Sequence, residues 1–453
     1  MEISKTIAHA VASSRYENIP EKTIENVKLG ITDAIGVGFA GTASSGYESV
    51  LDLTKGFGGR PDAAVLMGGV RLPAPAAAFL NAYAIHAYDF DDTFDEGTVH
   101  CYCIAFSAAL AAAESIGGVS GKDFLTAVTV GADLTARLAG CITSPVSWVR
   151  TPTCGSFGAA AAAARILGLD EKGVLNALGI VYNQTAGNFQ CAQDGGLVKN
   201  MLPGFAAEAG VRSALMARAG VSGAVSVFEG PYGFFNLYEQ GRFRPDYLLD
   251  GLGRDFFTDR LSIKPYPACR MAHAAIDAAL EIQKQEDFRP EDVEEIRIGT
   301  SRMCRSNVGR PFEIRSNPQV EAQFSIPYTV SIALNCGACE LPHFREDFIL
   351  RPEWQAYARK VSVFEDPALP EKEIRSASLL ARLKDGRELS ARIETFLGHP
   401  DNPVSTAFCL QKFDSCADCG RRHFTPQQKK AITDRALHLE ELEDVRALAD
   451  LLL

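Results

Sequence analysis

The stretch from His86 to His100, HAYDFDDTFDEGTVH, gathers five acidic residues, two histidines and two threonines in fifteen positions. It directly follows the apolar run APAAAFLNAYAI. A helix carrying His86, Asp89 and Thr93 at spacings of three and four would bring imidazole, carboxylate and hydroxyl together on one face. Such a set has the groups that general acid–base catalysis uses. The alternative is a solvated helix end whose acidic residues cap a neighbouring helix.

Length and composition indicate an acidic, globular chain. At 453 residues it is too long for one ordinary core, so two domains are expected, and 47% hydrophobic content gives each a core. The net charge of −11 disfavours nucleic acid and anionic membranes as partners, while a small anion can still bind a local cationic pocket. The N-terminus lacks a secretory pattern and no apolar run reaches the ~18 residues of a membrane span, so we expect a soluble, cytoplasmic protein.

The apolar pattern is helical from residue 1 to about residue 262. The segment GKDFLTAVTVGADLTARLAG follows Ser120, a possible N-cap, and FGAAAAAARILGLD is Ala-rich with a Gly-Leu-Asp stop. The next helix is expected to start at Asp170. Because Ala-rich faces let helices approach closely, this part of the chain predicts a compact multi-helix bundle.

The pattern changes after SIKPYPACRMAHAAIDAA. The run VEEIRIGT alternates like a strand, and SASLLARLKDGRELSARIET reads as two strands joined at Asp385-Gly386, a hairpin signal. From Asn402 the pattern is helical again, and QQKKAITDRALHLEELEDVRALADLLL is expected to form one helix that returns to the first domain. The sequence therefore predicts a mainly α protein: a large all-helical domain, residues 1–262 plus 401–453, with an inserted smaller α+β domain, residues 263–400.

Four segments together resemble one known family. HAYDFDDT followed by His100 is similar to a signature of the MmgE/PrpD family. The later segments LVKNMLPGFAAEAGVRSALMARAG, KPYPACRMAHAAIDAA and VEAQFSIPYTVSIAL resemble further family blocks in the expected order, so the resemblance covers most of the chain. It implies a large helical domain, a smaller α+β lid domain, a homodimer and a cofactor-free site in the cleft between the domains.

The resemblance also implies which side chains face the substrate. Carried over position by position, they are Asp89, Thr93, His100, Lys199, His273 and Tyr328, with His86 beside them. Each has an ordinary structural alternative. His273 in RMAHAAIDAA could be a core histidine, Tyr328 could pack with its hydroxyl bound to backbone, and Lys199 could be a solvated surface lysine.

The chemistry that the resemblance implies is proton transfer at carbon. In small di- and tricarboxylates, a C–H bond beside a carboxylate loses its proton while negative charge builds on the oxygens. Asp89 or His273 could be the base, provided that burial brings its pKa near the working pH. Tyr328 or His100 could protonate a leaving hydroxyl or a product carbanion.

Cationic side chains would hold the substrate carboxylates, Lys199 as a compact charge and Arg270 as a two-pronged donor. One departure from the family pattern adds a third cation. The segment SWVRTPTCGSFGAA has Val149 where the family usually has a histidine, and Arg150 follows it. Since a guanidinium cannot act as an acid near neutral pH, Arg150 exchanges proton transfer for anion binding.

A second departure is the acidic loop that contains Asp95 and Glu96, together with Cys101-Tyr102 after His100. Extra carboxylates there would repel a tricarboxylate, or hydrogen-bond an amine or hydroxyl of a smaller substrate. This favours an epimerase of the iminodisuccinate type as an alternative, because epimerisation needs only two proton-transfer groups on opposite faces.

The cysteines and glycines predict no cofactor. Two C-x2-C pairs, Cys336 to Cys339 and Cys416 to Cys419, are much farther apart than the ~15–20 residues of a zinc ribbon, so free thiols are expected rather than zinc. The Gly-containing runs lack the context of a nucleotide-binding loop, and no serine nucleophile elbow appears.

We therefore expect a cofactor-free carbon-acid enzyme that acts on a small di- or tricarboxylate. The favoured reaction is elimination of water from a 2-methylcitrate-like hydroxy acid, as in a dehydratase, which makes the protein a lyase. Epimerisation of an iminodisuccinate-like compound and decarboxylation of a cis-aconitate-like compound are the alternatives. A catalytically silent binding or structural dimer is the alternative from another class, motivated by Val149.

Overall fold

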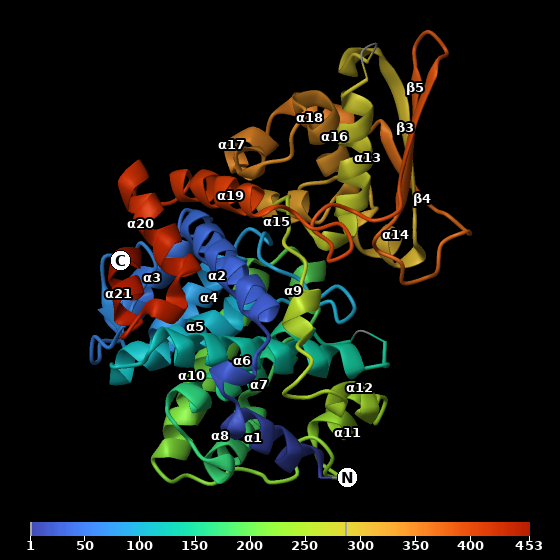
Figure 1. Cartoon of the computed structure of the whole chain (residues 1–453). Helices are drawn as coiled ribbons and strands as arrows, with labels where there is room; N and C mark the ends of the chain where they lie inside the picture. The colour runs from blue at the N-terminus through green and yellow to red at the C-terminus, as the bar shows by residue number, and fades with distance from the viewer. Residues whose placement is uncertain (1, 146, 286–287) are drawn as a thin grey trace.

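The computed structural model describes residues 2–145, 147–285 and 288–453 and is mainly α-helical, as predicted (Figure 1). The helices before residue 262 are α1 (Ile3–Ser13), α2 (Glu21–Gly41), α3 (Tyr47–Gly56), α4 (Ala74–His86), α5 (Tyr102–Ile116), α6 (Gly121–Cys141), α7 (Arg150–Ile166), α8 (Glu171–Val181), α9 (Gln190–Gln193), α10 (Leu202–Arg218), α11 (Phe234–Glu239) and α12 (Pro245–Leu249). None of the helices in the described ranges is both long and apolar enough to cross a membrane.

These helices share one hydrophobic core. Apolar side chains between Ile3 and Phe257 form it, and Phe413 to Leu452 add residues from the end of the chain. The C-terminal helices are α19 (Thr406–Asp418), α20 (Pro426–Leu437) and α21 (Arg446–Leu452). Helices α19 and α20 pack against α2, as Figure 1 shows, although the end of the chain and α2 are far apart in sequence. A short antiparallel pair, β1 (Ala63–Ala64) and β2 (Arg71–Leu72), lies between α3 and α4 in sequence.

A second hydrophobic core contains residues from Tyr266 to Phe396. Its sheet has the order β4-β3-β5-β6, with β3 (Val293–Thr300) parallel to β4 (Val361–Glu365) and antiparallel to β5 (Ala377–Leu383), which pairs with β6 (Glu388–Ile393). Helices α13 (His273–Gln283) and α16 (Ile326–Cys336) lie along this sheet in Figure 1. The remaining helices are α14 (Arg302–Val308), α15 (Pro318–Gln323), α17 (Glu346–Ile349) and α18 (Pro352–Ala358).

Several local predictions are confirmed. Ser120 and Asp170 are N-caps whose side chains accept hydrogen bonds from Asp123 N and Gly173 N, at 3.1 and 2.8 Å. VEEIRIGT is β3, and the hairpin at Asp385-Gly386 joins β5 to β6. In each case a short sequence signal supplies the hydrogen bonds or the turn.

The prediction of one continuous C-terminal helix is wrong. Helix α20 ends at Leu437, and α21 begins only at Arg446. Between them Leu442 O accepts a hydrogen bond from Gly121 N at 2.8 Å, and Val445 N donates one to Val119 O at 2.9 Å. The backbone groups that a helix would use internally therefore bind the start of α6, which is far away in sequence.

The acidic stretch is a loop, so the predicted helical face with His86, Asp89 and Thr93 is wrong. Helix α4 ends at His86, and α5 starts at Tyr102. Asp89 has φ +49°, in the left-handed region, where aspartate is tolerated better than most residues. A residue that is distant in sequence holds the loop in this shape. Thr93 N donates a hydrogen bond to Ser262 O at 3.0 Å, and Ser262 N donates one to Thr93 O at 2.8 Å.

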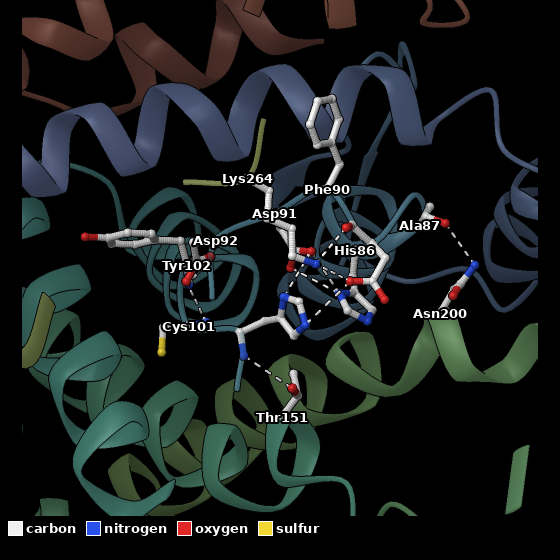
Figure 2. Close-up of polar contacts among 12 residues, drawn as sticks. His86, Ala87, Phe90, Asp91, Asp92, Cys101, Tyr102, Thr151, Asn200 and Lys264 are labelled. Atoms are coloured by element: carbon white, nitrogen blue, oxygen red, sulfur yellow. Dashed lines mark hydrogen bonds and ion pairs between the residues drawn. The ribbon is translucent and has the colours of Figure 1, made fainter. Parts of the chain in front are cut away.

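One residue of this loop caps a helix, as the structural alternative proposed. The Asp92 carboxylate accepts hydrogen bonds from Cys101 N at 2.9 Å and Tyr102 N at 3.0 Å, at the start of α5 (Figure 2). Asp92 is buried, and burial followed by the neighbouring Asp91 raises its pKa to about 7. The residue that caps α5 is therefore a buried aspartate with a raised pKa.

The fold predicts a sharp cost for a side chain on Gly41. A Cβ at Gly41 would lie 1.7 Å from Ala84 O, so α2 and α4 touch backbone to backbone just before the loop. We expect Gly41→Ala to lower the free energy of unfolding by about 2–3 kcal/mol, because a backbone atom cannot give way as a side chain can. Gly56→Ala is the control, since a Cβ there meets nothing within 4 Å and should be neutral or slightly stabilising. Urea denaturation of both variants measures the difference, and equal effects would contradict it.

The Asp92 cap predicts a pH-dependent stability. Because its folded pKa of about 7 lies above the value of ~3.9 for an unfolded chain, the folded state keeps a proton that the unfolded state loses. The contribution of Asp92 to stability therefore falls as pH rises from about 4 to about 7. We expect Asp92→Asn to gain about 2 kcal/mol relative to the wild type between about pH 5 and pH 7 in urea titrations. Exposed Asp52→Asn is the control, and a difference for Asp92→Asn that stays constant with pH would contradict the assignment.

Candidate active site

A cavity of about 330 Å³ opens beside the acidic loop and is lined by residues between His86 and Lys199 and by residues between Lys264 and Ile374. Of the residues predicted to face a substrate, it is lined by His86, Asp89, Thr93, His100, Arg150, Lys199 and Arg270. These residues come from the end of α4, the loop after it, the start of α7, and two 3-10 turns, η3 (Leu197–Met201) and η5 (Arg270–Ala272). The chain thus brings together charged side chains from positions 86 to 270.

Asp89 is the centre of a cluster of three charges. Its Oδ2 lies 2.6 Å from Lys199 Nζ, and its Oδ1 pairs with Lys264 Nζ, which also donates to Asp89 O at 2.7 Å. Burial opposes ionisation of Asp89, but the ammonium groups of Lys199 and Lys264 hold its pKa well below its usual range. Asp89 is therefore an anion that positions two lysines, and such a low pKa makes it a weak base.

Sequence reasoning missed Lys264. It begins the segment KPYPACRMAH, which was recognised, but nothing local shows that its side chain turns back to the acidic loop. In the structure Lys264 is fully buried, next to Ser262, whose backbone pairs with Thr93. Its contact with Asp89 depends on the crossing of two distant segments.

Two imidazoles stand beside this cluster. His86 Nδ1 lies 3.0 Å from Asp91 Oδ1 (Figure 2). His86 Nε2 lies 3.2 Å from Lys199 Nζ. Burial lowers the pKa of His86 to about 4, so the ring is neutral near pH 7. His100 Nε2 lies 3.8 Å from Asp89 Oδ1, beyond hydrogen-bond distance, on a side chain that lines the cavity. His100 thus offers a ring nitrogen that a ligand can reach.

The two arginines differ in what they already bind. Arg270 Nε pairs with Asp95 Oδ1 at 3.3 Å, and its guanidinium lies 3.7 Å from the centre of the Phe396 ring. Arg150 donates to two backbone carbonyls, Gly97 O and Ser144 O, both at 3.3 Å. Within the described ranges no carboxylate lies at ion-pair distance from Arg150, although the residue is only 8% exposed. Arg150 is therefore a cation available to a ligand.

The acidic loop is bound by the protein itself. Asp95 pairs with Arg270 and accepts a hydrogen bond from Ser262 Oγ, and Glu96 accepts one from Tyr247 OH at 2.5 Å. Asp95 and Glu96 were expected to repel a tricarboxylate or to recognise an amine. Glu96 does not line the cavity, so nothing in the structure supports this expectation for Glu96. Asp95 lines the cavity, but Arg270 balances its charge, so the expected repulsion is weaker.

Two predicted residues lie outside the cavity lining. His273 is fully buried, with Nε2 3.1 Å from Ala268 O and Nδ1 3.0 Å from Arg270 Nη1, and burial holds its pKa well below its usual range. Tyr328 is also fully buried and donates to His343 O at 2.5 Å. Each polar tip is hydrogen-bonded to a backbone carbonyl behind the cavity wall, and contact of either side chain with a substrate stays a prediction. His273 contacts the cavity lining at Arg270.

Four residues that line the cavity have a buried polar atom without a hydrogen-bond partner among the described residues, namely Thr93 Oγ1, His100 Nδ1, Arg270 Nη2 and Glu321 Oε1, and two of these matter most here. Thr93 Oγ1 and Arg270 Nη2 are buried and make no hydrogen bond with the described residues, and both side chains line the cavity. An unpaired buried polar group costs about 1–3 kcal/mol, so such groups at a cavity indicate an acceptor that a ligand supplies. A carboxylate oxygen accepts from both kinds of donor.

Two sets of side chains are close enough to hold a metal ion, namely His86 with Asp91 and Cys103, and Asp89 with Asp91 and His100. In the described part of the chain neither C-x2-C pair belongs to such a set, and all twelve cysteines are free. A cation bound to Asp89 would lie beside the ammonium groups of Lys199 and Lys264. These two lysines already supply positive charge where a metal would, so we assign no metal to the cluster.

Comparison with known proteins identifies the family of the chain. The model of the MmgE/PrpD N-terminal domain matches residues 5–246, and that of the MmgE/PrpD C-terminal domain matches residues 266–439. The chain is 28% identical to a cis-aconitate decarboxylase from Aspergillus terreus, over 99% of this chain and 96% of that protein, and 28% identical to the one from Homo sapiens. It is 26% identical to 2-methylcitrate dehydratase from Escherichia coli K12, over 74% of each chain. The protein belongs to the MmgE/PrpD family.

Proposed function

We propose that this protein is a lyase that forms or protonates a carbanion beside a carboxylate of a small di- or tricarboxylate. The observation that carries the proposal is the cavity that joins His100 Nε2 and the Lys199–Asp89–Lys264 cluster to unpaired donors on Thr93 and Arg270. Similarity to two kinds of lyase, decarboxylases and dehydratases, supports the reaction class.

Each group has a role that follows from its contacts. Arg150, Arg270 and Thr93 would bind substrate carboxylates, as bidentate or single donors. Lys199 would stabilise the charge that builds on the carboxylate beside the reacting carbon, and His100 would carry the proton. Because the lysines provide fixed positive charge in a buried site, the chemistry needs neither a metal nor an organic cofactor.

Decarboxylation and dehydration each form a carbanion beside a carboxylate. In decarboxylation the bond to one carboxylate breaks, CO₂ leaves, and the remaining carbon takes a proton from His100 or Lys199. In dehydration His100 takes the C–H proton, and the hydroxyl leaves with a proton from Lys199. Decarboxylation of a cis-aconitate-like compound is supported by relatives that align along almost the whole chain, and dehydration of a 2-methylcitrate-like acid by relatives that align over less.

Epimerisation of an iminodisuccinate-like compound is the third candidate, since it uses the same proton transfer without a leaving group. We further propose that residues 263–400 act as a lid domain on the helical domain and that the enzyme is a homodimer. Both follow from the family resemblance, and a cavity lined by residues before and after position 263 is compatible with a lid.

The reaction is tested by proton NMR in D₂O with cis-aconitate, 2-methylcitrate, citrate and iminodisuccinate in turn. We expect deuterium at a carbon beside a carboxylate, together with loss of CO₂ or water for the true substrate. Lys199→Ala should lower the rate by about 100-fold or more, because an electrostatic donor is removed. Exposed Lys172→Ala is the control and should match the wild type. No exchange with any compound would favour a silent binding protein.

Arg150 is expected to bind substrate equally in the ground and transition states. Removing one charge-assisted contact costs about 1.5–3 kcal/mol, so Arg150→Gln should raise KM by about 10- to 100-fold while kcat stays within a few fold. Exposed Arg218→Gln serves as the control. Steady-state kinetics with the substrate identified above measures both constants. A loss confined to kcat would instead assign Arg150 to the chemical step.

A further inference from the structure

Asp91 contacts both histidines of the site without lining the cavity. Its carboxylate is fully buried, with Oδ1 and Oδ2 at 3.0 and 3.1 Å from His86 Nδ1. Oδ1 also lies 3.2 Å from His100 Nδ1, and the two rings meet edge to face with centroids 4.5 Å apart. Figure 2 shows Asp91 directed at His86 from the loop that follows α4. One carboxylate therefore faces the Nδ1 atoms of two rings.

This contact determines which nitrogen of His86 carries the proton. An ionised carboxylate only accepts hydrogen bonds, so His86 Nδ1 must be the protonated nitrogen. In a neutral ring Nε2 is then an acceptor. Lys199, which can only donate, lies 3.2 Å from that Nε2. Two independent neighbours thus require the same tautomer of His86.

The same logic applies to His100, with one difference. Its Nδ1 is at ion-pair distance from Asp91 but not yet aligned for a hydrogen bond, and it has no other partner among the described residues. Hydrogen bonds of catalytic groups often align only when a ligand binds. With Nδ1 turned to Asp91, the Nε2 of His100 is the atom left for the cavity.

We propose that Asp91 is a positioning residue that fixes both rings in the tautomer protonated at Nδ1, leaving His86 Nε2 to hold Lys199 and His100 Nε2 to exchange a proton with the substrate. For its chemistry this inference rests on the proposed function. The C–H bond beside the substrate carboxylate breaks, its electron pair stays on carbon, and the proton moves to His100 Nε2. The resulting imidazolium lies between the anions Asp91 and Asp89.

The adjacent aspartate provides a matched control. Asp92 is buried like Asp91, but it binds backbone amides and no imidazole. Asp91→Asn and Asp92→Asn therefore make the same replacement at neighbouring buried positions. Only the first alters the partner of a histidine.

The test is a long-range ¹H–¹⁵N spectrum of the full chain labelled with ¹⁵N-histidine near neutral pH, with His86→Gln and His100→Gln used for assignment. We expect the wild type to show Nδ1 protonated and Nε2 unprotonated in both rings. In Asp91→Asn at least one ring should change tautomer, because an amide has one acceptor oxygen and adds a donor. Asp92→Asn should keep both. A wild-type ring protonated at Nε2, or unchanged rings in folded Asp91→Asn, would overturn the proposal.

Kinetics adds a readout that a purely structural role would not give. With the substrate found above, Asp91→Asn should lower kcat by about 100-fold or more and change KM by less than about threefold. A raised KM with unchanged kcat contradicts the proposal. If Asp91→Asn does not fold, the wild-type tautomers alone decide. If no compound is turned over, the proposed function fails, while the tautomers still test the role of Asp91.

Discussion

The contact between Asp89 and its two lysines is the constraint on which the site depends. Lys199 comes from the turn before α10, and Lys264 from the segment that leads into the second core. Burying either ammonium group without an anion nearby would be unfavourable. Without the two lysines, burial would favour the protonated form of Asp89. The left-handed backbone at Asp89 is held at the same point, since Lys264 also binds its carbonyl. One residue therefore joins the loop, the turn and the crossing segment.

A second buried pair ties this loop to the end of the chain. Lys412 on α19 lies 2.7 Å from Asp33 on α2 and donates to Phe90 O at 2.9 Å, one residue after Asp89. Lys412 thus links α2 and α19 to the backbone of the loop. Because breaking a buried pair leaves an uncompensated charge, such contacts fix position more than they add stability. The C-terminal helices form part of the support of the site, although they lie far from the cavity in sequence.

Much of the fold could be predicted because its signals are local. Ser120, Asp170 and the Asp385-Gly386 turn each act within a few residues, so their elements are where the sequence places them. The acidic stretch was misread as a helix because its backbone bonds go to Ser262, 169 residues beyond Thr93. No local periodicity records such a contact.

The candidate site could be predicted in composition but not in arrangement. Whether a polar residue of an apolar helix faces a cavity depends on what lies behind it, and for His273 and Tyr328 backbone carbonyls bind the polar tips away from the cavity. Asp91 belongs to the acidic stretch of the sequence, but only the structure shows that its carboxylate contacts the rings of both His86 and His100. The same geometry explains a division of labour among neighbouring acids: Asp89 holds the lysines, Asp91 holds the imidazoles, and Asp92 caps α5. Three carboxylates within four positions do different work because each meets a different set of donors, and a proton-transfer site requires such separation of roles.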